Sequence, residues 1–152
     1  MKSLHVYFYV QRRHSFDKTN TPIPFEFERL NIGEAMNLTS GKFTAPRNGI
    51  YSFSFIGLAY FPASSSNHEL SVKLYLNNNY IARGYADELG TGYQHDSLSL
   101  ESTLNLQAGD QIWLQIDTME KGTNLFESGG NYQNHFSGWL LQENISQSLI
   151  NK

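Results

Sequence analysis

The sequence contains no cysteine, few charged residues and no long apolar run. The absence of cysteine excludes a disulfide-stapled scaffold and any metal site with thiolate ligands. Charged residues make up only 16% of the chain and the net charge is −3, without the basic stripe that is typical of nucleic-acid binding. No run approaches the ~20 apolar residues of a membrane-spanning helix. We therefore expect neither a nucleic-acid partner nor insertion into a membrane.

The sequence is rich in aromatic residues, which make up 14% of the chain and recur in short alternating runs. Apolar residues occupy every second position in the segments 6–10, 50–55, 70–76 and 112–116, and in 98–106 except at Ser102, where we expect a bend. This period of two predicts strands, and turn residues such as those of Asn48-Gly49 separate the runs. About ten short strands without repeat or linker favour a β-sandwich or jelly roll. We expect one all-β domain over residues 1–143 and a polar tail over residues 144–152.

Five local motifs follow one another at domain spacing. They are VYFYV at 6–10, GKFTAP at 41–46, GIYSFSF at 49–55, LQAGDQIWL at 106–114 and FSGWLL at 136–141. In this order they resemble the globular head of the complement C1q family, which shares its fold with the tumour necrosis factor ligands. The resemblance covers residues 6–141 and implies a ten-stranded jelly-roll sandwich that forms a homotrimer.

The chain departs from the family pattern at three points. Ala45 stands where members often have cysteine, no collagen-like Gly-X-Y stretch precedes the domain, and the segment after Leu141 is longer than usual. The resemblance therefore predicts trimeric heads, but not a bouquet-like assembly or complement activation.

The resemblance implies a secreted, extracellular module that binds glycans or proteins on surfaces multivalently in innate immunity. Two alternatives stay open: a cytokine-like trimer that clusters a receptor, and a structural knob in a matrix. We expect no enzyme, because the chain has no Gly-x-Ser-x-Gly elbow, P-loop or dinucleotide fingerprint. Its five histidines are scattered without the spacing of metal ligands.

Residues 86–94 are predicted to form a loop that mixes acids with glycine, and Asp96 follows it. In several family members, acids in this loop bind calcium near the threefold axis. The resemblance places Asp96 at one such position and Asp87 or Glu88 at another. Calcium takes about six to eight oxygen ligands, so a site shared by three subunits would suit it. The alternative is a solvated acidic loop.

Two tyrosines in predicted loops, Tyr93 and Tyr132, are candidate ligand contacts because exposed tyrosine is enriched at binding interfaces. The alternative is partial burial under a neighbouring loop. The basic cluster of Arg12, Arg13 and His14 is interpreted as a solvated loop, since short charge runs lie mostly on surfaces.

The first and last predicted strands have two apolar faces. Tyr7 and Tyr9 provide the second apolar face of the first strand, and Trp139 and Leu141 do so in the last. A strand that is apolar on both faces is covered on both. If the two strands are neighbours, we expect another subunit to supply the second cover. The alternative cover is the segment 15–21 of the same chain.

Two sequons are present, at Asn37-Leu38-Thr39 and Asn144-Ile145-Ser146. Each is an acceptor pattern for N-glycosylation in a secreted eukaryotic protein. Sequons also occur by chance, so both modification and its absence stay open for Asn37 and Asn144.

Overall fold

The computed structural model describes residues 5–63, 68–88, 92 and 94–144, and within them the chain is all β, with eleven strands and no helix. The strands are β1 (Tyr7–Gln11), β2 (Phe27–Ile32), β3 (Met36–Asn37), β4 (Lys42–Thr44), β5 (Gly49–Phe61), β6 (His68–Leu76), β7 (Asn79–Glu88), β8 (Gln94–Leu106), β9 (Gln111–Met119), β10 (Asn124–Leu125) and β11 (His135–Glu143). The all-β prediction is confirmed. The structure has eleven strands where ten were expected, and two of them, β3 and β10, are only two residues long. This part of the chain has no helix long and apolar enough to cross a membrane.

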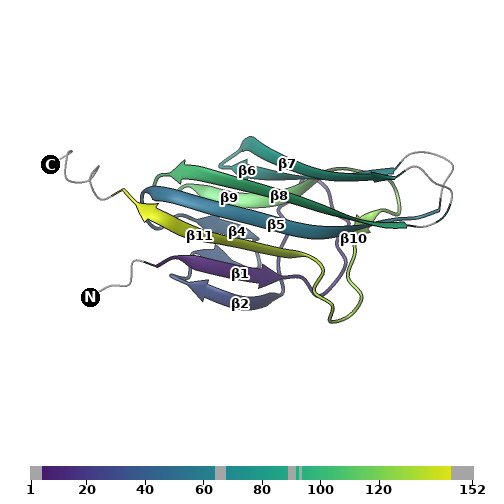
Figure 1. Cartoon of the computed structure of the whole chain (residues 1–152), viewed down its shortest axis with the longest axis horizontal. Helices are drawn as coiled ribbons and strands as arrows, with labels where there is room; N and C mark the ends of the chain where they lie inside the picture. The colour runs from purple at the N-terminus through teal and green to yellow at the C-terminus, as the bar shows by residue number, and fades with distance from the viewer. Residues whose placement is uncertain (1–4, 64–67, 89–91, 93, 145–152) are drawn as a thin grey trace.

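Two antiparallel sheets pack against each other (Figure 1). In sheet A the order is β10-β5-β11-β1-β2, and β8, which is outside this order, also pairs with β5. In sheet B the order is β3-β4-β9-β6-β7. The first strand therefore lies beside the last, although they are far apart in sequence. Such long-range neighbours in two antiparallel sheets are the topology of a jelly roll. The predicted jelly-roll sandwich is confirmed.

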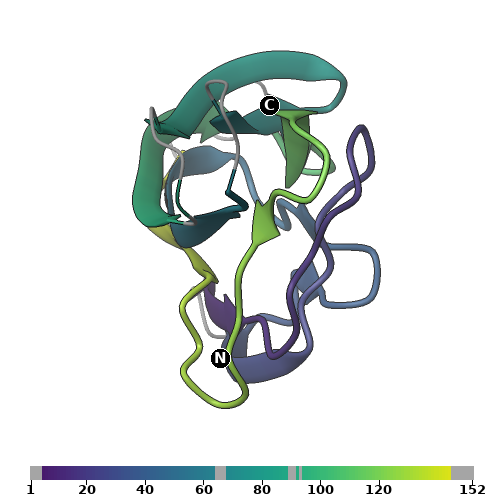
Figure 2. The ribbon, with the colours of Figure 1, turned by 90° about the vertical axis from the view of Figure 1, so that its right-hand side faces the viewer.

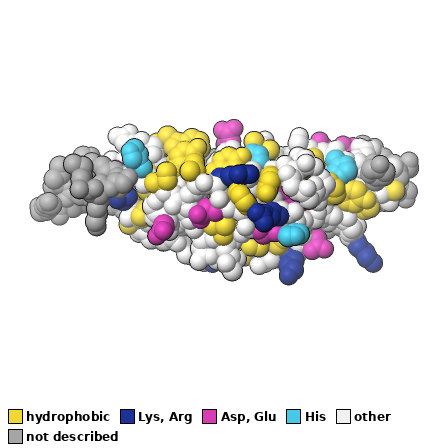
Figure 3. Space-filling view, turned by 90° about the horizontal axis from the view of Figure 1, so that it is seen from below, with side chains coloured by type: hydrophobic (Ala, Val, Ile, Leu, Met, Phe, Trp, Pro, Cys, Tyr) yellow, Lys and Arg dark blue, Asp and Glu magenta, His cyan; other side chains and the backbone are white. Residues whose placement is uncertain are grey.

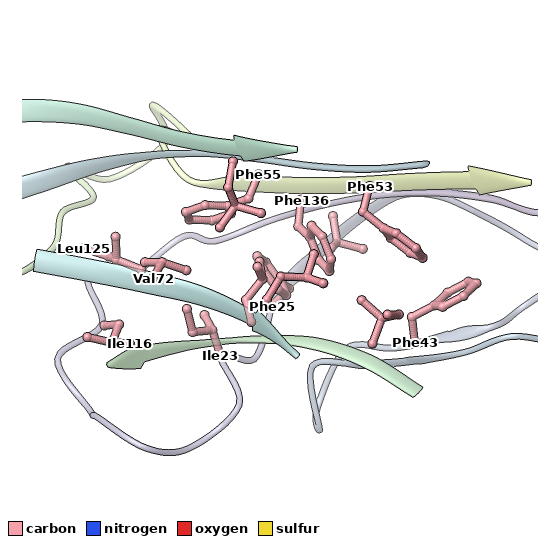
Figure 4. Packing of buried hydrophobic residues seen from close by; sticks show 14 of the residues in the cluster. Ile23, Phe25, Phe43, Phe53, Phe55, Val72, Ile116, Leu125 and Phe136 are labelled. Atoms are coloured by element: carbon pink, nitrogen blue, oxygen red, sulfur yellow. The ribbon is translucent and has the colours of Figure 1, made fainter. Parts of the chain in front are cut away.

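The space between the sheets is filled largely by aromatic rings (Figure 4). Phe8, Phe53 and Phe136 come from three adjacent strands of sheet A and are at most 1% exposed. Phe43 reaches them from sheet B, with its ring centroid 5.4 Å from that of Phe8 and 5.3 Å from that of Phe53. Aromatic pairs at these separations each contribute about 0.5–1.5 kcal/mol beyond the area they bury.

The irregular segment between β1 and β2 closes one side of the sandwich. Ile23 and Phe25 are buried, and Figure 4 shows Ile23 beside Ile116 of β9. The backbone N–H of Ile23 donates to the carbonyl of Leu114 at 2.8 Å. Because backbone and side chains of this segment both contact sheet B, it belongs to the sandwich, although it has no regular secondary structure.

Gly138 of β11 lies where the aromatic core leaves no room for a side chain. A Cβ added there would be 2.5 Å from Cε2 of Phe8 and 2.7 Å from Cδ1 of Phe53. Real Cβ contacts are not this short, so the two rings fit only against a backbone without a side chain. The glycine thereby fixes how closely the rings pack under β11.

Replacing Gly138 by alanine is expected to destabilise the fold by about 1–3 kcal/mol, the usual cost of overpacking a core. Alanine otherwise favours a strand over glycine through backbone entropy, so a net loss isolates the steric effect. Gly92→Ala is the control, because apart from its chain neighbours no heavy atom of the described residues lies within 4 Å of the added carbon. Urea unfolding of both variants measures the difference. Equal stability of the two variants would contradict the close contact.

Candidate functional site

Sheet A presents an apolar outer surface centred on its first and last strands. β1 and β11 are neighbours, with Tyr7 opposite Trp139. The rings of these two residues stack at 5.8 Å, and Tyr9 stacks on His135 at 5.4 Å. The two strands are therefore neighbours, as the interface prediction requires.

The segment 15–21 does not cover this surface. Phe16 pairs with Leu125 of β10, and Thr19 forms a bridge with Ile116 of β9. The segment thus runs along the open side between the sheets, and Tyr7 stays 37% exposed. The alternative that the same chain covers the tyrosines through this segment is wrong, because its backbone hydrogen bonds are made to β9 and β10 instead.

The apolar surface extends to strands on both sides of the pair. Ile32 and Leu30 of β2 lie opposite Tyr7 and Tyr9, and Ile56 of β5 lies opposite His135. Opposite residues of an antiparallel pair share a face, so these side chains form one surface. We call it the sheet A face, and it comprises Tyr7, Tyr9, Leu30, Ile32, Ile56 and Trp139. Leu141, 54% exposed, lies at an irregularity of β11 near its edge.

Figure 3 looks at the molecule from the side of β2. Hydrophobic side chains gather along the upper border of this view, with basic side chains and a histidine next to them. The large apolar groups are therefore grouped on the surface and not scattered singly. Contiguous apolar patches of this kind mark interaction sites on soluble domains.

The predicted acidic loop is shorter than expected. β7 continues to Glu88 and β8 begins at Gln94, so Asp87, Glu88 and Asp96 all lie in strands. The prediction of a loop over the whole of 86–94 is wrong, because residues 86–88 pair with residues 68–70 of β6. Successive strand residues point to opposite faces, so Asp87 and Glu88 diverge from each other.

The described residues of one chain do not gather the predicted calcium ligands. Among them, no group of three or more histidine, aspartate or glutamate side chains is placed to hold a metal ion. The side-chain amide of Gln94 lies against the carboxylate of Glu88, with a contact of 2.6 Å when its nitrogen faces that group. A complete calcium site would thus need carboxylates from further copies of the chain, and calcium binding stays a prediction.

The structure describes one of the two tyrosines that were predicted to contact a ligand. Tyr93 lies outside the described residues. Tyr132 is half-buried with a φ of 51°, and its ring centroid is 5.5 Å from that of Phe27. The guanidinium of Arg29 lies 5.4 Å from the same ring. Tyr132 therefore packs on β2 of its own chain, and a ligand contact there stays a prediction.

The two sequon asparagines lie in different surroundings. Asn37 is exposed in β3, and its Oδ1 accepts a hydrogen bond from the backbone N–H of Ser40 at 3.0 Å. Asn144 follows β11, and its Nδ2 donates to Oδ1 of Asn105 at 3.0 Å. This Nδ2 is the atom to which a glycan would be attached. The rest of the second sequon lies outside the described residues, and both modifications stay predictions.

The interpretation of Arg12 as part of a solvated loop is wrong, because its side chain is buried. The side chain donates to the carbonyl of Pro24 at 2.6 Å and pairs with Glu26 at 3.1 Å. Burial lowers the pKa of Arg12, and the charges of Glu26 and Glu127 oppose this effect. The sequence offers no periodic signal for such a contact, because the partner groups lie in irregular segments.

Glu26 is held as a carboxylate by its neighbours. Burial raises its pKa, but hydrogen bonds from His14 and from backbone N–H groups, together with the charge of Arg12, outweigh burial. The net pKa lies below the ordinary value. The contacts among Arg12, His14 and Glu26 hold the irregular segment between β1 and β2 against the end of β1. Their role is structural.

His135 lies at the edge of the sheet A face, and burial lowers its pKa below the ordinary 6.5, although the charge of Glu127 partly opposes this effect. The unfolded chain thus binds a proton at higher pH than the folded chain does. Folding stability should therefore fall as the pH drops through about 6.5 and level off below the folded pKa. His135→Gln is expected to flatten this dependence, measured as urea midpoints between about pH 7.5 and 5. An unchanged slope would contradict the burial effect.

Comparison with known proteins places this fold in a family. A family model for the C1q domain matches residues 7–141. The chain is 32% identical over 127 residues to complement C1q tumor necrosis factor-related protein 7 of Mus musculus, covering 84% of this chain and 40% of that protein. It is 29% identical over 150 residues to Caprin-2 of Danio rerio, covering 92% of this chain and 15% of that protein. The chain thus spans less than half the length of these relatives.

A solved structure agrees with the sequence matches. The globular domain of zebrafish complement 1qA protein superposes with a TM-score of 0.66 at 17% identity, over 91% of this chain and 99% of that one. At this identity the likeness shows the fold. The family model covers nearly all of the sandwich from β1 to β11, and the chain belongs to the C1q domain family.

Proposed function

We propose that this domain is a secreted, extracellular recognition head that assembles as a homotrimer and binds glycans or proteins on surfaces in innate immunity. The observation that supports the proposal most is the uncovered sheet A face. Tyr7, Leu30, Ile32 and Ile56 are each between 37% and 45% exposed. Removing such side chains from water by association is favourable at roughly 25 cal/mol per Å² of apolar area.

A second apolar surface complements the first. Ile81 and Tyr85, four residues apart and so on the same face, are exposed along β7, which is an edge strand of sheet B. A twofold dimer uses the same patch on both subunits, whereas a closed ring of three uses two different patches. In the proposed trimer the β7 edge of one subunit packs on the sheet A face of the next.

Family membership supports a recognition role and not a catalytic one. The relatives include proteins named for complement C1q and tumour necrosis factor, and the structural neighbour is a complement globular domain. A trimer presents three equal binding surfaces, so weak single contacts become strong through avidity. This arrangement suits the detection of repeated ligands on a surface.

Light scattering coupled to size exclusion tests the trimer. The wild-type chain is expected at about three times its mass of 17.3 kDa. Ile56→Glu places a charge on the sheet A face and should shift the protein to monomer, because a buried unpaired carboxylate is costly. Thr118→Glu adds the same charge to an exposed position of β9 and should leave the mass unchanged. A monomeric wild-type protein would refute the trimer.

Calcium is proposed as a ligand shared between subunits, with Asp96 as the main contributor. Thermal melting in calcium and in chelator should differ for the wild-type trimer, since a ligand at 100 times its Kd stabilises the folded state by about 2.7 kcal/mol. Asp96→Asn should abolish the difference, whereas Asp17→Asn, an exposed acid elsewhere, should retain it. Identical wild-type melting in both conditions would exclude a stabilising calcium site.

A further inference from the structure

A hollow of about 430 Å³ lies between the irregular segment 16–24 and the turn 39–42. Its lining combines three kinds of residue: the apolar Phe16 and Pro22, the hydroxyl-bearing Thr21 and Thr39, and the cationic Lys18 and Lys42. Small-molecule sites typically measure about 300–1,000 Å³ and combine apolar walls with a few polar groups. The hollow matches this description in both size and lining.

The walls of the hollow are held in place by the sandwich. The backbone N–H of Asn20 donates to the carbonyl of Ile116 at 3.0 Å, and that of Phe25 donates to Leu38 at 3.0 Å. At Gly41, an added Cβ would lie 2.1 Å from the carbonyl oxygen of Ile23. The two segments are therefore in direct backbone contact, and a ligand would meet a site that is already formed.

The charge of the hollow is positive, although the whole chain has a net charge of −3. No aspartate or glutamate lines it, and in the described part of the chain neither Lys18 nor Lys42 forms an ion pair. Lys73, by contrast, pairs with Asp117 at 3.1 Å. The ammonium of Lys42 lies 4.5 Å from the ring centroid of Trp113 and makes a cation–π contact with it. Two lysines in a lining that contains no acidic residue favour an anionic ligand.

The hydroxyls and rings narrow the class of ligand. Within the described residues, the side-chain hydroxyls of Thr21 and Thr39 have no hydrogen-bond partner in the protein, so they are available to a ligand. A pyranose ring has hydroxyls at its rim and apolar C–H faces, which suit these hydroxyls and the rings of Phe16 and Pro22. Lysine binds sulfate or carboxylate as a point charge.

We propose that this hollow binds an anionic sugar unit, a pyranose ring that carries a sulfate or a carboxylate. The inference rests on the proposed role of the domain as a recognition head and names a ligand class and a site for it. The hollow lies beside β9 and β4, apart from the sheet A face. In Figure 2 the two segments that form it, purple and blue, lie on the right-hand side of the molecule. In sheet B, β6 separates β9 from the β7 edge, so the proposed trimer contacts leave the hollow accessible.

The test measures binding of three tetrasaccharides by isothermal titration calorimetry at physiological salt. The probes are a heparin tetrasaccharide with sulfates and carboxylates, a hyaluronan tetrasaccharide with carboxylates alone, and neutral maltotetraose. The protein is the full chain made without N-glycans, since Thr39 belongs both to a sequon and to the hollow. At least one charged probe should bind, with maltotetraose at least about tenfold weaker, because charge-assisted hydrogen bonds are lost.

Variants locate the binding. Lys18→Glu and Lys42→Gln are each expected to weaken the charged probe about tenfold or more, the size of one hydrogen bond to a charged group. Lys121→Glu is the matched control: it makes the same charge change at another exposed lysine without an ion pair in the described residues, and it should change affinity less than about twofold. Light scattering and melting confirm that each variant keeps the wild-type mass and fold.

The outcomes test ligand binding in the hollow separately from the proposed role as a trimeric recognition head. Equal weakening by Lys18→Glu and Lys121→Glu would overturn the hollow, because affinity would then follow net charge alone. Unchanged binding in the Lys18→Glu/Lys42→Gln double variant, with mass intact, would overturn the hollow and leave the trimeric recognition head standing. Wild-type affinity for charged probes in a monomeric wild-type protein would support the hollow and overturn the trimer.

Discussion

The contact between the backbone of Gly138 and the rings of Phe8 and Phe53 is the constraint on which the rest of the structure depends. It lets β11 lie between β1 and β5 over an aromatic layer that side chains from sheet B complete. Because β11 occupies this place, Trp139 and Tyr7 stack on the outer side of the same sheet. Through Gly138, β11 thus contributes to the tightly packed inner face of sheet A, and through Trp139 it contributes to the apolar outer face.

Alternation along the chain predicted most of the longer strands and the sides on which they are buried, but not β3, β10 or the end of β7. Tyr51, Phe53 and Phe55 are all fully buried, as a period of two requires. The sequence did not predict that β1 pairs with β11, and the interface prediction only assumed it. Periodicity indicates which face of a strand is buried but not which strand lies beside it. The fold class itself came from motifs spread over the whole chain, each of which is weak alone.

The site was harder to predict because its groups are brought together by pairing and turns that the local sequence does not specify. The acids at 87 and 88 were assigned to a loop because glycine and polar residues follow them, but backbone pairing with β6 extends the strand through both. Arg12 was placed in solvent because charge usually lies there, and its partners Pro24 and Glu26 meet it only after the chain has turned. The hollow near Lys18 and Lys42 could not be found from sequence, because the two lysines are far apart along the chain and only the fold brings them together.

β1 and β11 run antiparallel as neighbours, with Tyr7 beside Trp139, so the chain enters and leaves the sandwich at the same end (Figure 1). A fusion partner attached before β1 and another attached after β11 would emerge side by side. In a parallel ring of three such domains, six attachment points would converge on one pole, and the loops of the other pole would be left unencumbered. The architecture is therefore suited to use as a scaffold for display, in which cargo is anchored at one pole and the remaining surface stays open to solvent.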